Sequence, residues 1–257
     1  YSPTGKRKKN AKNIHVYGQE MHGQTWLLCK IFLEVCDIPN KIAYGNTLTS
    51  PAFDKINGND SFDFIIANPP FGVDWKHDYV DIFENMLLGE ASNFLLIKDE
   101  KGDFVTPKKS DGQFLFMLHI LKLLDVSKQN GKHAKAAVIS STGLVTSGKE
   151  TSAEGIIRKT IFNNGWVDTL IEQPKGMFTN TDISTLIWFL DNKNQEKRLD
   201  RTYMIKIDNT YVNSHFKNKE LKVLHSVAEN KKDKQIHGYS VKNIESIIAL
   251  MHHKTDF

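Results

Sequence analysis

The 257-residue chain contains only two cysteines, Cys29 and Cys36, which lie seven residues apart in the apolar stretch TWLLCKIFLEVC. This spacing puts both thiols on one face of a helix, where we expect them to lie in the core. It is not the ligand spacing of a zinc site, so we expect no metal centre. So few cysteines are typical of a reducing compartment, which predicts a cytoplasmic protein.

Long apolar runs and a dominant charge are also absent. No stretch of about 18 apolar residues is present, which argues against a membrane-spanning helix. The basic segment 1–13 is not followed by the apolar core of a signal peptide. The 34 Lys and Arg residues nearly balance the 30 Asp and Glu residues. The resulting net charge of +4 permits a nucleic-acid partner but does not indicate one by itself.

Three regions differ in composition along the chain. Residues 1–13 are polar and basic, and we expect a loose arm there. Residues 14–207 carry the periodic apolar patterns of one large domain, and hydrophobic residues make up 40% of the whole chain, enough for a real core. Residues 208–257 are rich in Lys and His and show two weak helical patterns, which predicts a C-terminal helical appendage.

Strand and helix patterns alternate along the main domain. The continuous apolar run at residues 64–67 is typical of a strand buried on both faces, as in a parallel sheet. Asp111 is expected to cap the strongly amphipathic helical pattern at residues 111–124. Further strand patterns occupy residues 13–20, 41–46, 134–140 and 166–173, and helical patterns occupy residues 21–36, 111–124 and 151–162. This alternation predicts a doubly wound α/β sheet in three layers, mostly parallel.

The last two strand patterns, residues 183–191 and 202–208, are joined by a short polar connection. That connection is too short for a helix with its turns. We therefore expect these two strands to form an antiparallel pair at the edge of the sheet.

The stretch FIIANPPFG, residues 64–72, ends an apolar strand with Asn68, two prolines and Phe71. In open α/β sheets, ligands bind beyond the carboxyl ends of the strands. Because Pro69 and Pro70 have no N–H, their backbone offers only carbonyl acceptors, that of Pro69 foremost, and the side-chain amide of Asn68 adds its acceptor oxygen. Two such acceptors can hold both protons of an exocyclic amino group. That arrangement makes the nitrogen a better nucleophile, while Phe71 offers a flat face for stacking.

Two readings of these four residues stay open. In the structural reading, the residues form a Pro-Pro turn after a strand, and Phe71 only packs against its neighbours. In the functional reading, they form a binding site for a planar substrate that carries an amino group. The predicted position at the end of a buried strand favours function.

Polar side chains also end the two preceding strand patterns. Glu20 ends one, and an acid at such a position bonds ribose hydroxyls in nucleotide-binding α/β folds. Asn46 ends the next, where an amide can bond an adenine edge. Each alone has a plain alternative, because Glu20 could be an acid at a helix N-terminus and Asn46 part of a Gly-Asn turn. Taken together, the strand ends suit a site for an adenosine-containing cofactor beside a substrate amino group.

These motifs resemble those of the adenine-N6 DNA methyltransferases, and most of all the modification subunits of type I restriction–modification systems. The resemblance covers about residues 14–207 and rests on GQE, GNTL and NPPF, followed by GQFLFMLHIL, KAAVISSTGLV and EGIIRKTIFNNGWVDTLIEQPKGMFTNTDISTLIWFL. NPPF alone is shared with other amino-group methyltransferases, whereas the segments in this order are much more specific. The implied fold is a Rossmann-like methyltransferase sheet.

The resemblance implies S-adenosylmethionine as methyl donor, held by Glu20 on its ribose, by Asn46 and Thr47 near its adenine, and by Asn68. It implies that Asn68, Pro69, Pro70 and Phe71 hold an adenine flipped out of double-stranded DNA. Phe178 and Thr181 match a segment that borders the target-base pocket. In such systems a specificity subunit chooses the DNA sequence and a restriction subunit completes the complex.

One feature of the family is missing from the sequence. The family has a glycine-rich loop upstream of the Glu-bearing strand, which cradles the methionine end of the cofactor, and no such loop is found here. We therefore expect a sheet that is incomplete at its N-terminus, with exposed apolar surface, poor cofactor binding and self-association of the isolated chain. The alternatives to an active subunit are a truncated inactive fragment, a DNA- or protein-interaction module, and a methyltransferase for protein amides.

Overall fold

The computed structural model describes residues 14–53, 62–175, 177–178, 183–193, 195–198 and 201–207. The predicted basic arm, residues 1–13, and the predicted C-terminal helical appendage, residues 208–257, lie outside the described residues. Both stay predictions.

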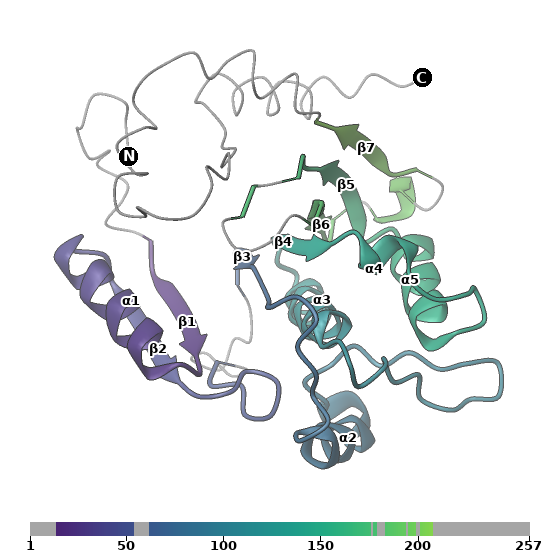
Figure 1. The fold of residues 1–257 in the computed structure, drawn as a ribbon, viewed down its shortest axis with the longest axis horizontal. Coiled ribbons are helices and arrows are strands. Elements are labelled where there is room, and N and C mark those ends of the chain that lie inside the picture. The colour runs from purple at the N-terminus through teal and green to yellow at the C-terminus, as the bar shows by residue number, and fades with distance from the viewer. Residues whose placement is uncertain are drawn as a thin grey trace, which may run out of the picture.

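Strands and helices alternate through the described residues (Figure 1). The strands are β1 (Val16–Glu20), β2 (Asn40–Tyr44), β3 (Phe64–Ala67), β4 (Lys135–Ser141), β5 (Val167–Glu172), β6 (Thr185–Asp191) and β7 (Tyr203–Lys206). The α-helices are α1 (Gly23–Val35), α2 (Tyr79–Leu87), α3 (Gln113–Gln129), α4 (Gly143–Thr146) and α5 (Ala153–Asn163), and the short 3-10 turns are η2 (Gly89–Ala91) and η3 (Gln195–Arg198).

The described strands form two separate sheets. β1 and β2 make a parallel pair with α1 lying along it, while the larger sheet has the order β3-β4-β6-β5-β7 (Figure 1). In the larger sheet β3 runs parallel to β4, and β7 runs parallel to β5. β6 is antiparallel to both of its neighbours. The predicted α/β class with a mostly parallel sheet is confirmed.

The predicted antiparallel pair at the sheet edge is wrong. β6 lies inside the sheet between β4 and β5, and β7 forms the edge as a parallel partner of β5. Burial explains this placement. β6 carries Leu186, Trp188 and Leu190, which are all buried, whereas β7 alternates half-buried and exposed side chains. The short polar connection, which includes η3, therefore carries the chain across β5 to the outer edge.

The core lies on one face of the larger sheet. α3 and α5 pack in a single cluster with Ala136, Val138 and Trp188. The side chains that point to the opposite face of β3 are apolar but open: Phe64 is 75% exposed and Ile66 is 86% exposed. The prediction that this strand is buried on both faces is therefore wrong, and apolar surface lies exposed on the sheet, as expected.

Two local predictions on helices need correction. Cys29 is exposed and Cys36 half-buried, so the pair does not lie in the core. The reason is that the two-stranded β1–β2 ribbon covers little of α1, in which Leu33 is the buried residue. Asp111 is not the N-cap of α3, because that position is held by Gly112, although Asp111 Oδ1 accepts the N–H of Gln113 at 3.1 Å. None of the described helices has the length and apolar run that a membrane crossing needs.

Candidate functional site

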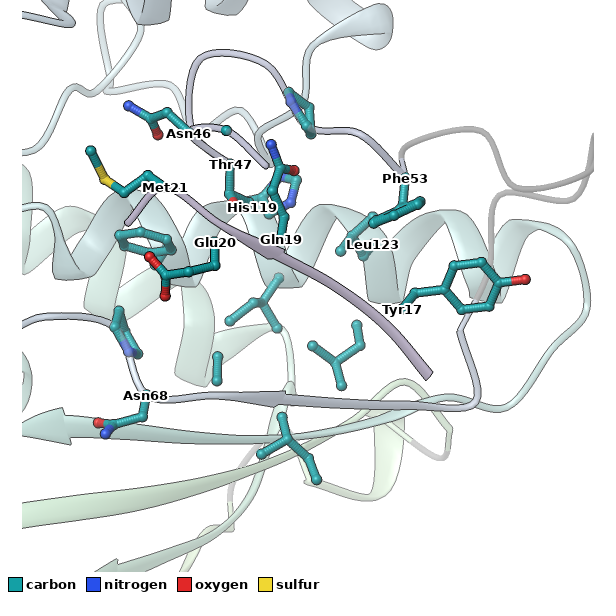
Figure 2. A pocket seen from close by; sticks show the side chains of 18 of the residues that line it. Tyr17, Gln19, Glu20, Met21, Asn46, Thr47, Phe53, Asn68, His119 and Leu123 are labelled. Atoms are coloured by element: carbon teal, nitrogen blue, oxygen red, sulfur yellow. The ribbon is translucent and has the colours of Figure 1, made fainter. Parts of the chain in front are cut away.

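A cavity of about 560 Å³ lies between β1 and β3 (Figure 2). Apolar side chains of β3 and α3, including Ile65, Ile120 and Leu123, line much of it. Six of the predicted site residues also line it: Glu20, Asn46, Thr47, Asn68, Pro69 and Pro70. Figure 2 shows Glu20 at the end of β1, Asn68 at the end of β3 and Asn46 in the loop above them, all toward one end of the cavity. Residues from three strand ends therefore share one site.

The turn after β3 presents Asn68 at the mouth of this site. Strand pairing of β3 with β4 ends at Ala67, which is opposite Val138. Asn68 follows immediately and is exposed, whereas Pro69 is buried and Pro70 is exposed. A buried proline after an exposed amide fixes the direction of the chain, because the ring locks one backbone torsion. The side-chain amide of Asn68 is therefore exposed at the end of β3, and the proline that follows restricts the backbone there.

Two aromatic residues that lie far apart in the sequence meet just beyond this turn. The ring centroids of Phe71 and Phe178 are 6.1 Å apart, and the planes are at 88° to each other, an edge-to-face contact. Both side chains are half-buried. Neither ring lines the cavity between β1 and β3. Thr181, the third residue predicted for the target-base pocket, lies outside the described residues.

Glu20 is held at the end of β1 by backbone contacts of the neighbouring strand. Glu20 and Tyr44 are register partners, and Gly45 N–H donates to the carbonyl of Glu20 at 3.1 Å. Gly45 has φ of 147°, a value that L side chains rarely adopt, which suits a glycine at this turn. The Glu20 carboxylate accepts the N–H of His22 at 2.7 Å through Oε1. A carboxylate has a second oxygen for ribose hydroxyls.

Asn46 has structural partners on both sides of its amide. Its Oδ1 accepts the N–H of Leu48 at 2.9 Å, and its Nδ2 donates to Asp78 Oδ2 at 3.2 Å. Asp78 immediately precedes α2 and follows the turn that carries Phe71. Asn46 therefore connects the loop after β2 to the segment after β3. An amide retains one N–H and one lone pair beyond these two bonds, which is what a contact with an adenine edge would use.

Gln19 was not among the predicted site residues, yet it shapes the same loop. Its Nε2 donates to the carbonyl of Ser50 at 2.9 Å, and its Oε1 accepts the N–H of Ala52 at 2.9 Å. These bonds fix the chain that runs past Asn46 and Thr47 against the end of β1. The motif GQE contains the residue, but a single glutamine gives no sequence signal for such a role.

The segment after Phe71 is held by a second segment, residues 108–113, which we call the clasp. The N–H of Trp75 donates to the carbonyl of Lys109 at 2.9 Å, and its indole Nε1 donates to the carbonyl of Lys108 at 3.0 Å. The N–H of Gly112 donates to the carbonyl of Val73 at 2.9 Å. Three bonds thus fasten the residues that follow the turn.

A buried acid anchors the far end of the clasp. The N–H of Lys108 donates to Glu154 Oε1 at 2.9 Å, and Glu154 is a buried residue in the first turn of α5. Burial by itself raises the pKa of the Glu154 carboxyl, but the N–H groups of Lys108 and of Glu154 itself, the Lys108 charge and Ser152 together hold that pKa below its usual value. The carboxylate is therefore charged at neutral pH.

Residues 3–252 match the family described as N-6 DNA methylase. The chain belongs to this family. Among curated proteins it is similar to the type I restriction enzyme HindI methylase subunit of Haemophilus influenzae, with 30% identity over 74% of this chain and 37% of that protein. It is also similar to the type I restriction enzyme MpnII methylase subunit of Mycoplasma pneumoniae, with 26% identity over 97% of this chain and 40% of that protein. The chain thus spans less than half the length of these relatives.

A solved structure shares the fold. The methyltransferase subunit of a type I restriction–modification system from Streptococcus thermophilus superimposes with a TM-score of 0.65 at 21% identity, over 96% of this chain and 49% of that one. The predicted resemblance to the modification subunits of type I systems is confirmed. Across the described residues no group of three or more His, Cys, Asp or Glu side chains could hold a metal ion.

Proposed function

We propose that this N-6 DNA methylase chain forms the target-base region of a DNA methyltransferase that methylates the N6 amino group of adenine within a type I restriction–modification complex. The observation that carries the proposal is the shared cavity: Glu20, Asn46 and the Asn68–Pro70 turn, from three strand ends, all line it. A base-holding turn beside a nucleoside-type site is the arrangement that methyl transfer to an amino group needs.

The chemistry of the turn supports an adenine amino group as the acceptor. The Asn68 amide oxygen and the Pro69 carbonyl accept the two N–H protons, which keeps the lone pair of nitrogen from delocalising into the ring. Asn68 has no ionisable group, so the proton that the nitrogen sheds on methylation leaves to water. Phe71, braced edge-on by Phe178, offers the face on which a flipped base stacks. Flipping the adenine out of the duplex costs a few kcal/mol, and the hydrogen bonds and stacking at this turn offset that cost.

The residues on the other side of the cavity fit S-adenosylmethionine. Glu20 would hold the ribose hydroxyls, and Asn46 and Thr47 would lie at the adenine, while Asn68 borders both ligands. When bound, this cofactor supplies an electrophilic methyl group. The fit rests on donor and acceptor types: a carboxylate oxygen for two hydroxyls, and an amide with one N–H and one lone pair still to use.

The partners follow from the relatives rather than from a contact in this chain. The similar curated proteins are named as methylase subunits of type I restriction enzymes. We therefore propose double-stranded DNA as substrate, and a specificity subunit and a restriction subunit as the partners of the complete protein.

Substitution of Asn68 in a full-length subunit that carries this segment tests the proposal. Asn68→Ala removes one acceptor of the amino group, and we expect kcat to fall by about 10²–10³-fold, the cost of losing one well-placed hydrogen-bonding group. Tritium transfer from labelled S-adenosylmethionine to plasmid DNA, with the specificity subunit present, gives kcat. Calorimetry should show a much smaller effect on cofactor binding, because Glu20, Asn46 and Thr47 keep their proposed contacts. Retained methyl transfer by Asn68→Ala would remove the residue from this role.

A further inference from the structure

Gln113, the first residue of α3, is buried at 2% exposure and uses both ends of its side-chain amide. Its Nε2 donates to both carboxylate oxygens of Asp111, at 3.0 and 2.9 Å, and lies 3.1 Å from Ser141 Oγ. Its Oε1 accepts the N–H of Ser141 at 2.8 Å. The backbone N–H of Gln113 also donates to Asp111 Oδ1. A single side chain therefore joins Asp111 to Ser141.

Ser141 belongs to β4, the strand that pairs with β3, and β3 leads into the turn that carries Asn68. It is the last residue of β4, and it pairs with Thr185 of β6. β3 runs parallel to β4 and its pairing ends where Ala67 meets Val138. β4 therefore continues for three residues past that point, while the chain of β3 enters the turn at residues 68–71. Whatever is bonded to Ser141 is fixed relative to the end of β3.

Asp111 belongs to the clasp, residues 108–113, which holds the chain just after Phe71. Its neighbour Gly112 donates to the carbonyl of Val73, and Lys108 and Lys109 accept from Trp75. A Cβ placed on Gly112 would lie 3.5 Å from Val73 O, so the two backbones are already in close contact. Movement of Asp111 would therefore move Val73 and Trp75, and through them the chain that leads back to Phe71.

We propose that Gln113 is a positioning residue for the target base, which sets the turn at residues 68–71 by bonding the clasp, through Asp111, to the end of β4. The inference rests on the function proposed above. The pattern of donors and acceptors allows one arrangement: the amide N–H groups face the carboxylate, and the amide oxygen faces a backbone N–H. A buried network of this kind specifies geometry because an incorrect pairing leaves polar groups unsatisfied.

The substitution Gln113→Glu tests this role because it keeps the size of the side chain and reverses one set of contacts. A carboxylate can still accept from the Ser141 N–H, but its other oxygen faces the acceptor oxygens of Asp111. Two carboxylates at this distance repel each other. We expect kcat for DNA methylation by the full-length subunit to fall by about 10²-fold, the size of effect that a small misplacement of a bound group has. The Kd for S-adenosylmethionine should change far less than kcat, because Glu20 ends β1 and Asn46 and Thr47 follow β2, so that Asn68 is the one proposed cofactor contact in the turn.

The double variant Asp111→Asn, Gln113→Glu restores the pairing with the roles exchanged. The amide N–H introduced at position 111 then donates to the carboxylate introduced at position 113, and the Ser141 hydroxyl rotates to donate as well. We expect kcat to return to within about threefold of the wild-type value, as for a pair whose effects are strongly non-additive. The thermal midpoint, followed by circular dichroism, should be the same for the double variant and the wild type.

The same helix provides a matched control at its other end. Gln129 bonds Asp125 Oδ2 at 2.8 Å through Nε2, but it is exposed. Gln129→Glu makes the same chemical change beside an aspartate, and we expect wild-type kcat because solvent screens the pair.

The outcomes separate the two proposals. Wild-type kcat in Gln113→Glu would overturn the positioning role, while the proposed function would stand. A loss of kcat in Gln113→Glu that the double variant does not restore, with a matching fall in thermal midpoint, would also overturn it, since it would show a folding defect only. If the wild-type subunit with its partners methylated no DNA, the proposed function would fail, and this inference with it.

Discussion

Two regions of the molecule differ in how much core each has. The five-stranded sheet, α3 and α5 pack around one large cluster, in which Leu115, Leu121 and Ile157 are fully buried. The β1–α1–β2 unit, residues 16–44, buries Leu33. α1 instead exposes an apolar stripe at helical spacing: Leu28, Ile31, Phe32 and Val35 are each at least half exposed.

This difference in the size of the core distinguishes the two halves of the proposed site. The turn with Asn68 and the clasp are attached to the well-packed sheet, so their geometry is supported within this chain. Glu20 and Asn46 are attached to a two-stranded ribbon with one helix, a unit that is marginal by itself. We infer that the target-base half is the more rigid of the two. The cofactor half depends on contacts such as the bond from Asn46 to Asp78.

The largest expected effect is on the core of the sheet. Trp188 is 1% exposed and donates from Nε1 to Ser140 Oγ at 2.8 Å. Trp188→Ala should cost about 3–5 kcal/mol of unfolding free energy, from lost burial and a new cavity. Phe32→Ala, the matched change on α1, should stay within about 0.5 kcal/mol, because that ring is already exposed. Urea titration followed by circular dichroism measures both, and equal losses would contradict the comparison.

A smaller effect is expected on the cofactor side. Glu20→Ala removes the carboxylate proposed for the ribose hydroxyls, and binding of S-adenosylmethionine to a full-length subunit should weaken by about 1–3 kcal/mol. Glu84→Ala, at an exposed acid on α2, serves as the control and should bind as the wild type does. Calorimetric titration distinguishes them. Equal affinity of the Glu20 and Glu84 variants would show that Glu20 does not contact the donor.

The smallest expected effect is a pH dependence of the clasp. Because the pKa of Glu154 is lowered in the folded chain, its charged form stabilises the fold above the ordinary carboxyl pKa. That contribution is lost as the pH falls through the lowered value. Wild type should exceed Glu154→Gln in stability by about 1 kcal/mol at pH 7, and the gap should close in acid. The measurement is the urea midpoint of both proteins between pH 7 and pH 3.

Glu150 gives a matched comparison for that measurement. The Lys159 ammonium lowers the pKa of the Glu150 carboxyl through a hydrogen bond of 2.8 Å, but this pair is exposed. Solvent screens such pairs, so Glu150→Gln should change the urea midpoint little at any pH. A pH-dependent gap as large for Glu150 as for Glu154 would show that burial of the acid is not what matters.

The sequence predicted the class of fold and the main strand ends for a local reason. Apolar periodicity and turn residues are encoded over a few neighbouring positions, and they placed Glu20, Asn46 and Asn68 at the ends of strands. The order of the strands in the sheet was harder to predict. The position of β6 between β4 and β5 depends on which strand buries Trp188 best, which is a property of the whole sheet.

Single polar residues were the least predictable part of the site. Gln19, Asp78 and Gln113 look ordinary in the sequence, yet each bonds groups that are far away along the chain: Gln19 reaches Ser50, Asp78 reaches Asn46, and Gln113 reaches Ser141. No periodic signal marks such contacts, because their partners are brought together only when the strands pair. The exposure of Cys29 escaped prediction for the same reason, since it depends on how much of α1 the ribbon covers.

By itself, the sequence determined that this chain has alternating strands and helices, and that an Asn-Pro-Pro-Phe turn ends an apolar strand. Those features follow from local propensity and from the missing N–H groups of proline. Only the tertiary structure decided that Phe71 meets Phe178, that three strand ends share one cavity, and that Gln113 joins the clasp to β4. The reason is that contacts between distant residues depend on strand order and packing, which no short stretch of sequence contains.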